Sequence, residues 1–452
     1  MQKKYLQLSI ALMLVVSFAV AQDEPKETGE QVKKGWNFGG LPVVSFDSDL
    51  GFQYGALLNL FNYGDGSMYP DFKHNLYLEW SRYTKGSGIN RIFFDSKTLI
   101  PGIRFTSDLS YLTDDMYDFY GFNGYEAIYN VNWTDSDDDS YLSRAFYKYD
   151  RKLFRYSIDL QGKLPIEKLG WAAGVALLNY EVGSVDIARL NEGKDENLLP
   201  DIPSLYDHYK EWGIISAEEA NGSFVTYLKA GVVYDTRDNE PNPNSGMWTE
   251  AVFAYAPSFM GIGNDFQHMK FSLIHRQYFT IFPEKLTFAY RLGYQGTVFG
   301  TCPFYLQPNL TTLILRGSSN EGLGGGKSLR GIIRNRVIGD GVAYGNMELR
   351  WKFVRFQFIK QNFYLSLNTF VDGGQVVTPV KFSKDDVNPL DVESSVTMGQ
   401  LFSNDKEELH MSFGAGLRIV MNRNFIIAID HGRPFDSRDG AGGTYIGLNF
   451  LF

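Results

Sequence analysis

The sequence predicts an all-β protein, a 16-stranded antiparallel transmembrane β-barrel of a bacterial outer membrane. Three observations predict this fold: an export signal at the N-terminus, stretches in which apolar and polar residues alternate, and a composition rich in aromatic residues and glycine. We expect residues 1–21 to be a signal peptide, residues 22–50 a short periplasmic or lumen segment, and residues 51–452 the barrel.

The N-terminus indicates the compartment. Two lysines precede an apolar run over residues 6–20, and the small residues Ala19 and Ala21 form the pattern that signal peptidase recognises. The run is short for the ~20 residues of a spanning helix and ends in a cleavage signal, so we prefer a cleaved signal peptide to a retained membrane anchor. The chain is therefore predicted to be exported to the bacterial outer membrane.

The composition fits a membrane barrel. Apart from the signal, the sequence has no stretch of roughly 18 apolar residues, so we expect no spanning helix. Aromatic residues make up 15% of the chain, with 28 Tyr and 35 Phe, although the mean hydropathy is only −0.22. Alternating strands with aromatic girdles at both rims have this composition. The formal charge of −9, without a basic run, argues against nucleic acid as a partner.

Alternation along the chain is the strongest sign of strands. Between residues 343 and 353 the odd positions include Leu349 and Trp351, whereas the even positions include Glu348 and Arg350. One face suits lipid and the other suits water or a polar interior. A soluble sandwich also alternates, but the length of the chain, its export signal and its last strand favour a membrane barrel. The same division recurs over residues 75–81, 362–372 and 412–419.

Sixteen segments follow this pattern, an even number as bacterial barrels require. Both ends of the chain then face the periplasm, so residues 185–223, 299–340 and 375–408 are expected to be extracellular loops and residues 422–424 a periplasmic turn. The same parity places residues 113–140 on the periplasmic side. The predicted strands are 51–63, 73–84, 90–99, 102–112, 141–151, 155–164, 170–184, 224–237, 247–257, 266–280, 285–298, 341–355, 362–374, 409–421, 424–433 and 443–452.

The last of these segments has a distinctive pattern. Ile446, Leu448, Phe450 and Phe452 lie on one face of a strand expected to run as far as residue 452. The segment resembles the C-terminal signature by which outer-membrane barrels are recognised by their insertion machinery. We therefore interpret Phe450 and Phe452 as a terminal insertion signal.

Four short motifs carry a resemblance to a known family. The first is a strand-turn-strand motif over residues 234–248, which contains Asp235, Arg237, Asp238 and Gly246. The second is Leu329-Arg330-Gly331-Ile332, with Ile332 where the family usually has an aromatic residue. The third and fourth are residues 345–350 and 370–374. In this order they resemble the BamA/TamA-type outer-membrane assembly-factor superfamily, or bacterial surface antigen family.

The resemblance implies that the sixth extracellular loop, which carries Arg330 and Gly331, inserts into the lumen and meets the strand acid at Asp372. The alternation independently places Glu348, Asp372 and Asp430 on the lumen face. We therefore predict a lock on this loop, a bidentate contact between Arg330 and Asp372 with Glu348 as second acceptor. The alternative is that Arg330 is a solvated loop residue.

The resemblance also implies a function in outer-membrane protein assembly, insertion or export. In the family's mechanism, the first and last strands pair weakly and their exposed edge templates incoming strands. Family members usually carry periplasmic POTRA domains, whereas residues 22–50 are fewer than the ~40 that an independent core needs. We expect a monomeric barrel that contacts outer-membrane lipids and works with periplasmic or outer-membrane assembly proteins. The alternative is a passive diffusion pore or a structural barrel that retains the superfamily fold.

The sequence shows no sign of an enzyme. The six histidines are scattered without metal-ligand spacing, and there is no Gly-x-Ser-x-Gly elbow. The acidic run over residues 135–139 is better explained as a solvated loop than as a Ca²⁺ site. Glycines 324–326 before Lys327 resemble a phosphate loop only superficially, because in a barrel loop they let the backbone fold tightly. We therefore expect no cofactor and no metal.

Overall fold

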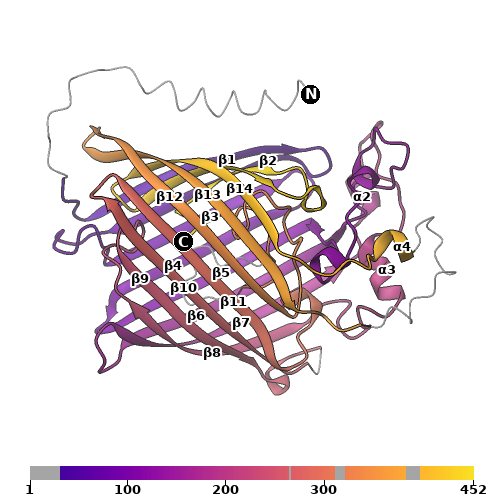
Figure 1. The fold of residues 1–452 in the computed structure, drawn as a ribbon, viewed down its shortest axis with the longest axis horizontal. Helices are drawn as coiled ribbons and strands as arrows, with labels where there is room; N and C mark the ends of the chain where they lie inside the picture. Colours follow the sequence, from indigo (N-terminus) through magenta and orange to yellow (C-terminus); the bar gives the residue numbers. More distant parts are fainter. Residues whose placement is uncertain (1–30, 264–265, 311–320, 383–397) are drawn as a thin grey trace.

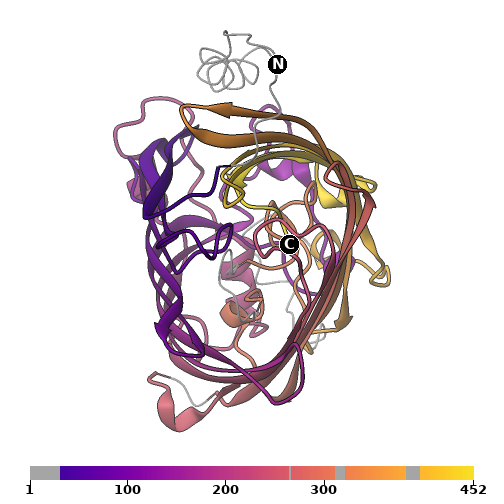
Figure 2. The same cartoon turned by 90° about the vertical axis from the view of Figure 1, so that its left-hand side faces the viewer.

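The structure is a computed structural model that describes residues 31–452 except residues 264–265, 311–320 and 383–397. Sixteen strands form one antiparallel sheet in which each strand pairs with its neighbours in sequence. The strands are tilted and surround a central space (Figures 1 and 2). Within the described residues, no helix is long and apolar enough to cross a membrane. The expected signal peptide lies outside the described part of the chain.

The strands alternate between buried or half-buried residues facing the lumen and more exposed residues facing outward. Short helices occur in the loops, among them α2 (Ile187–Asn191), α3 (Leu205–Glu211) and α4 (Met398–Leu401). The strands are β1 (Trp36–Asp47), β2 (Gly51–Asn62), β3 (His74–Tyr83), β4 (Gly88–Ile100), β5 (Ile103–Asp118), β6 (Lys148–Lys163), β7 (Leu169–Gly183), β8 (Phe224–Asp235), β9 (Gly246–Ala256), β10 (His268–Phe282), β11 (Leu286–Gly300), β12 (Gly341–Phe358), β13 (Gln361–Thr378), β14 (His410–Met421), β15 (Phe425–Pro434) and β16 (Gly443–Leu448).

The predicted number of strands is confirmed, but it is correct because two errors cancel. The predicted strands 141–151 and 155–164 are wrong as a pair, since β6 runs unbroken between Lys148 and Lys163. β1 is an additional strand ahead of residue 51, where the barrel was expected to begin. Residues 36–46 were expected either to pack into the lumen or to form an extra strand, and the second alternative is correct, although two adjacent glycines and Pro42 weaken the strand signal. Proline is tolerated there because β1 lies at an edge of the sheet.

These two errors also explain the misplaced loop. The connection between β5 and β6 covers residues 119–147 and lies at the same end of the barrel as residues 184–223, so the periplasmic placement of residues 113–140 is wrong. From β7 onward the two errors compensate. The expected long loops therefore emerge at one end, and the turns after β8, β10, β12 and β14 lie at the other end.

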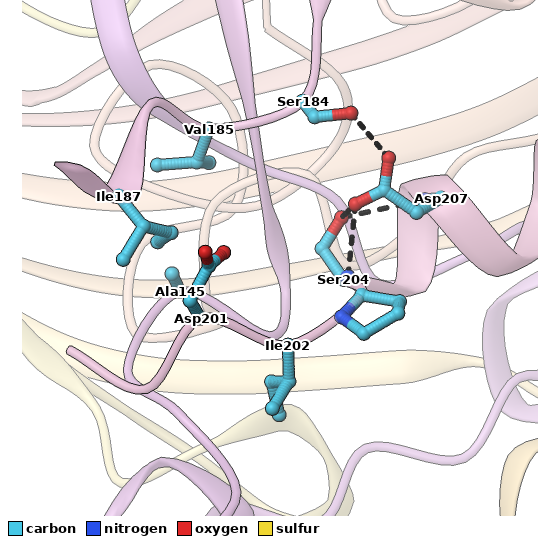
Figure 3. Close-up of a pocket in the computed structure, with 9 residues that line it drawn as sticks. Ala145, Ser184, Val185, Ile187, Asp201, Ile202, Ser204 and Asp207 are labelled. Atoms are coloured by element: carbon cyan, nitrogen blue, oxygen red, sulfur yellow. Dashed lines mark hydrogen bonds between the residues drawn. The ribbon is translucent and has the colours of Figure 1, made fainter. Parts of the chain in front are cut away.

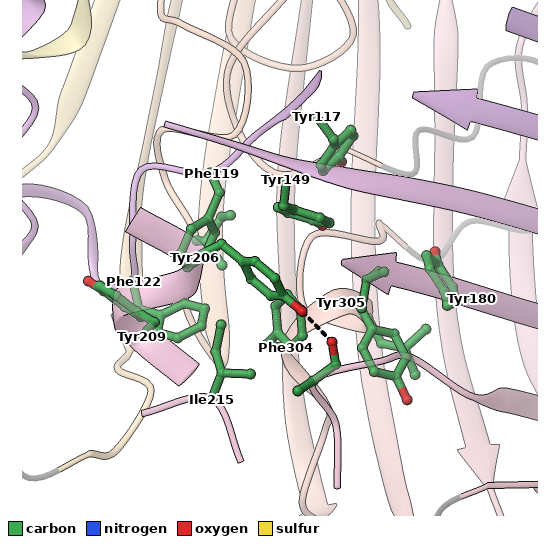
Figure 4. Packing of buried hydrophobic residues seen from close by; sticks show 14 of the residues in the cluster. Tyr117, Phe119, Phe122, Tyr149, Tyr180, Tyr206, Tyr209, Ile215, Phe304 and Tyr305 are labelled. Carbon is green, nitrogen blue, oxygen red and sulfur yellow. Dashed lines mark hydrogen bonds between the residues drawn. The ribbon is translucent and has the colours of Figure 1, made fainter. Parts of the chain in front are cut away.

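An aromatic cluster caps the end that carries the long loops (Figure 4). Phe119, from the β5–β6 loop, packs edge-to-face on Tyr209 of α3 with ring centroids 5.2 Å apart. Phe304 packs against Tyr206 and Tyr149 at 5.9 Å. Offset and edge-to-face rings are the favoured geometries of aromatic pairs. Three loops thereby share one apolar core instead of lying separately in solvent.

An ion-pair cluster joins the β1–β2 turn to this cap. Asp49 accepts hydrogen bonds from Arg144 Nε at 2.8 Å and from Lys194 Nζ at 3.1 Å. Burial raises the pKa of Asp49, but the bonds to Arg144 and Lys194 outweigh burial and hold the pKa below its ordinary value. The first hairpin of the barrel is therefore fastened to the loops at this end.

A cavity of about 310 Å³ lies at the edge of the cap (Figure 3). Three of its polar lining residues, Ser184, Ser204 and Asp207, are engaged in local structure. The backbone N–H of Asp207 donates to Ser204 Oγ and the backbone N–H of Ser204 donates to the Asp207 carboxylate, which forms the capping box of α3. Ser184 also donates to Asp207. These side chains hold the loop together and supply no free group for chemistry.

The topology can be tested by surface labelling. A tag inserted between Gly193 and Lys194, at the capped end, should be labelled by antibody on intact cells. A matched tag between Pro283 and Glu284, in the turn after β10, should be labelled only after the outer membrane is permeabilised. Labelling of the second site on intact cells would contradict the strand order.

Candidate functional site

Arg330 is the centre of the lumen site. Its Nε and Nη2 donate to the two carboxylate oxygens of Asp372 at 2.9 and 3.0 Å, and its backbone N–H donates to Asp372 at 2.9 Å. Its Nη1 donates to Glu348 at 2.6 Å and lies 3.7 Å from Asp430. The guanidinium lies 3.6 Å from the centroid of the Phe370 ring. The predicted bidentate contact is present, and Arg330 is 0% exposed, so it is not a solvated loop residue.

Gly331 lets the loop approach the wall of the barrel. Its φ of +100° is a left-handed conformation, and a Cβ atom there would lie 2.6 Å from the backbone nitrogen of Arg433. On the wall, a Cβ on Gly432 would lie 2.7 Å from the carbonyl oxygen of Arg330. The N–H of Gly331 donates to Tyr445 Oη of β16 at 3.0 Å. The loop is therefore bound to β12, β13, β15 and β16 together.

The same loop also crosses to the opposite wall. Arg334 pairs with Asp118 of β5 at 2.5 Å, and Asn335 Nδ2 donates to the Asp118 carbonyl at 3.0 Å. Arg336 donates to the carbonyl oxygens of Gly124 and Ala127 in the β5–β6 loop. Charged and polar side chains thus span the lumen between the last strands and β5.

Ile332 occupies the position where the family motif usually has an aromatic residue. It is fully buried in a small cluster with Leu329, Val337, Tyr344 and Val376. Apolar packing of this kind contributes about 1.5–3 kcal/mol for each fully buried large side chain. The tip of the loop is therefore packed without an aromatic residue at this position.

The turn motif between β8 and β9 is also a compact polar structure. Asp235 accepts two hydrogen bonds from the guanidinium of Arg237, at 2.9 and 3.1 Å, and one from its backbone N–H at 3.0 Å. The guanidinium lies 4.4 Å from the centroid of the Trp248 ring. Asp238 accepts from the N–H groups of Asn244 and Ser245.

Gly246 completes this motif. It has a φ of +90°, and a Cβ there would lie 2.2 Å from the Thr236 carbonyl oxygen. The predicted motif residues therefore shape a single turn.

The sequence did not predict the contacts that the β8–β9 turn makes with other strands. Glu240 pairs with Arg104 of β5 at 2.7 Å and with Lys97 of β4 at 2.9 Å. Asn244 accepts from Lys352 of β12 at 2.6 Å. The turn therefore crosses the end of the lumen opposite the cap and joins two distant walls. No local sequence signal identifies Glu240, because its partners lie more than one hundred residues away.

The prediction for the terminal segment is wrong. β16 ends at Leu448, Asn449 has a φ of +70°, and the residues after it do not continue the strand. Phe450 and Phe452 are buried, Phe450 with Tyr364 and Ile426 and Phe452 with Tyr278 and Ala289. These partners come from the walls of the barrel, so the two phenylalanines do not share a lipid face with Ile446. Their interpretation as an insertion signal stays a prediction.

The two edges of the sheet form a seam. Within the described residues, no ladder joins β1 to β16, and the sheet ends on these two strands. Both present apolar side chains outward, including Phe38, Val44 and Ile446. Along the outer edges of β1 and β16, the backbone N–H and C=O groups therefore have no neighbouring strand to pair with.

Side chains connect the two sides of the seam at the end opposite the cap. Asn424 Nδ2 donates to Tyr63 Oη at 2.8 Å and to the Pro70 carbonyl at 2.6 Å. The Phe425 ring packs with Phe61 and Phe72, and a Cβ on Gly39 of β1 would lie 2.5 Å from it. We call this contact between the β14–β15 turn and residues 39–72 the clasp.

The fold and its lumen contacts define a bacterial outer-membrane β-barrel whose inserted loop is held by an arginine. The chain belongs to the Omp85 superfamily, whose domain matches residues 96–452. This confirms the resemblance inferred from the four motifs and places the protein in the bacterial outer membrane. Omp85 barrels are insertion and transport proteins rather than enzymes.

Three solved structures are similar to this chain to different degrees. Haemophilus ducreyi BamA lacking POTRA domains 1–3 is similar with a TM-score of 0.51 and 15% identity, over 92% of this chain and 71% of that chain. CdiB from Escherichia coli has a TM-score of 0.48 and 11% identity, over 92% of this chain and 61% of that chain. CdiB from Acinetobacter baumannii has a TM-score of 0.44 and 15% identity, over 93% of this chain and 60% of that chain. No match is found among the curated proteins.

The loop lock predicts a strong and non-additive stability effect. Arg330→Ala leaves the buried Asp372 without its cation and Glu348 with Arg350 alone, and breaking a buried pair costs about 3–5 kcal/mol. Asp372→Ala should lower stability by a similar amount, and the double variant should be no worse than either alone. The temperature at which the compact barrel band is lost in gel electrophoresis measures this. Arg438→Ala is the control, because its exposed pair with Asp436 contributes at most about 1 kcal/mol. Strictly additive losses would contradict the lock.

Gly331 provides a second prediction. Gly331→Ala adds a Cβ against the β15 backbone and should destabilise the barrel by more than the about 1–2 kcal/mol that a left-handed conformation costs an L residue. Gly193→Ala is the matched control, since Gly193 has a φ of +71° but nothing within 4 Å of the added Cβ. The same thermal gel assay should show a larger loss for Gly331→Ala, and equal losses would show that the close approach to β15 is unimportant.

Proposed function

We propose that this protein assembles or exports outer-membrane proteins by offering the edges of β1 and β16 to an incoming strand. The observation that carries the proposal is the unladdered seam between these strands. An unpaired strand edge presents a row of N–H and C=O groups that an extended polypeptide satisfies by adding a strand. Family membership supports the proposal, because the resemblance implies the same use of the seam.

The rest of the barrel supports a seam that separates locally. Arg330 and Gly331 bind the loop to β12, β13, β15 and β16, so the last strands are held from inside the lumen. β1 is paired with β2 alone, while the Asp49 ion pairs fasten the first hairpin to the cap. The hydrogen bonds that hold each edge therefore do not depend on pairing between the edges. An inserted strand would leave both sets of contacts intact.

The lumen contacts count against the alternative of a passive diffusion pore. The inserted loop joins Asp118 to the last strands, and Glu240 joins the β8–β9 turn to β4 and β5. Both crossings lie in the path that a solute would take. Their charged side chains are paired, so widening the path requires breaking ion pairs as well as moving backbone.

Reconstitution separates the two functions. In liposomes the purified protein should accelerate folding of an added urea-unfolded outer-membrane barrel, and Arg330→Ala should reduce this acceleration. The same vesicles should show little swelling in sugars of low molecular mass. Rapid swelling without accelerated folding would refute the proposal and favour the pore. Purification from native membranes in detergent tests separately for bound assembly partners.

A disulfide across the clasp tests whether the seam must separate. The Cβ of a residue at position 39 would lie 2.5 Å from Cγ of Phe425, so Gly39→Cys and Phe425→Cys bring their Cβ atoms within the ~4 Å that a disulfide requires. The oxidised double variant should lose the folding acceleration and regain it on reduction. Each single variant serves as a control for loss of the glycine or the ring. Full activity in the oxidised form would exclude opening of the seam at this point.

A further inference from the structure

We propose that the tip of the β12–β13 hairpin is a binding site for anionic phospholipid at the end of the barrel opposite the cap. The hairpin tip consists of residues 353–361, and its end lies opposite α3 and α4 (Figure 1). Its apolar side chains enter the adjacent leaflet, and the basic side chains around it bind the phosphate groups. The site lies on the outer surface of the barrel, so the proposal does not depend on strand addition at the seam.

A β-bulge keeps apolar side chains on the outer face where the hairpin tip begins. Lys352 pairs with Ser366 and Val354 pairs with Leu365, so Phe353 is an extra residue on β12. A bulge of this kind redirects the side chains that follow it. Phe353 and Val354 are consecutive, yet both are exposed. Without the bulge, one of these two apolar residues would face the lumen.

The outer face of the hairpin tip continues the lipid-facing band of the barrel. On β12 this band includes Leu349 and Trp351, both of which are exposed. Beyond the bulge it continues through Phe356 and Phe358, and the Phe356 ring stacks on Phe363 of β13 with ring centroids 5.3 Å apart. Aromatic residues at the rim of a membrane barrel lie at the level of the headgroups. The hairpin tip therefore extends an established lipid contact.

The turn that closes the hairpin carries an unusual residue. Ile359 and Lys360 have φ angles of +47° and +56°, and Ile359 is 74% exposed. Asparagine and glycine are the usual residues in a two-residue turn with positive φ, and a β-branched residue there is an outlier. A large apolar side chain thus occupies a position where the backbone favours a polar residue. Contact with acyl chains accounts for an exposed apolar side chain at this point.

Basic residues surround the hairpin tip. Residues 353–361 and the turns 283–285 and 422–424 contain four basic residues and one carboxylate. The whole chain, in contrast, has a formal charge of −9. This part of the surface is therefore positively charged although the protein is acidic. The basic residues are Lys285, Arg355, Lys360 and Arg423, and the carboxylate is Glu284.

Contacts between the three segments bring these charges together. Arg355 donates one hydrogen bond to the Glu284 carboxylate and one to its backbone carbonyl. The hydrogen bond from Arg355 is the main cause that holds the pKa of Glu284 below its ordinary value, and the charge of Arg423 contributes as well. Asn422 Nδ2 donates to Gln361 Oε1 at 2.6 Å. The turns on both sides of the hairpin tip therefore lie against it.

The charge balance identifies the lipid class. The only carboxylate in these three segments is engaged by Arg355, and the exposed side chains of Lys285 and Lys360 form no ion pair within the described residues. Long basic side chains beside a lipid face direct their charged ends to the headgroups. An anionic surface attracts each such side chain about fivefold more strongly than a neutral one. Phosphatidylglycerol, which has a net negative headgroup, therefore fits this surface better than a zwitterionic lipid.

Quenching by spin-labelled lipid tests the apolar part of the site. The full chain with Ile359→Cys is labelled with a nitrobenzoxadiazole fluorophore and reconstituted in phosphatidylcholine vesicles containing a lipid with a nitroxide near the top of its acyl chain. The fluorophore should be quenched several-fold more than one at Asp65→Cys, which is in the β2–β3 turn at the same end and has a side chain 71% exposed. The unaltered chain gives the background, because Cys302 is buried. Equal quenching at the two positions would overturn the proposal.

Lipid selectivity tests the basic part of the site. In the labelled Ile359→Cys chain, nitroxide-labelled phosphatidylglycerol should quench more strongly than nitroxide-labelled phosphatidylcholine at equal mole fraction, and added salt should reduce the difference. Lys285→Gln together with Lys360→Gln should remove most of this preference. Lys168→Gln, in the exposed β6–β7 turn outside the three segments, is the control and should preserve it. Equal quenching by the two lipids, or a preference that the double substitution leaves unchanged, would overturn the assignment of an anionic lipid.

Discussion

The buried contact between Arg330 and Asp372 is the interaction on which the rest of the lumen depends. An arginine that is completely removed from water loses its hydration, and only well-placed acceptors compensate for that loss. Asp372 supplies a bidentate acceptor, and Glu348 a further one. Glu348 lies on β12 and Asp372 on the adjacent β13. The loop therefore binds at the place where these two carboxylates face the lumen together. One ion-pair cluster thereby fixes where a long extracellular segment lies.

This anchoring has consequences for both ends of the barrel. From Arg330 the loop continues to Asp118 on the opposite wall, and its glycine lies against β15 and the Tyr445 hydroxyl of β16. Backbone pairing is absent from the seam between β1 and β16 as described, but the last strand is still held by the loop. The sheet therefore ends on two edge strands, and the last of them is held from inside the lumen by the loop.

The lower lumen combines two further elements that sequence patterns did not bring together. Glu240 extends from the β8–β9 turn to Arg104, and residues 449–452 turn inward beside Arg350. Both bring polar or aromatic groups onto a wall rich in arginine. The terminal segment follows β16, whose last pair with β15 is Leu448 with Ile427, and the clasp contacts Phe425 at the start of β15.

The sequence by itself determined which side chains face the lumen, because a strand directs successive residues to opposite faces. That periodicity placed Glu348, Asp372 and Asp430 inside, and the loop motif placed Arg330 opposite them. Only the tertiary structure decided how the edges meet, since β1 combines glycine with proline and shows no clean alternation. It also decided that Phe450 and Phe452 turn inward, although their spacing fits a lipid-facing strand equally well. Local periodicity fixes the face of a residue, but partners across the lumen follow from strand number, curvature and closure, which involve the whole chain.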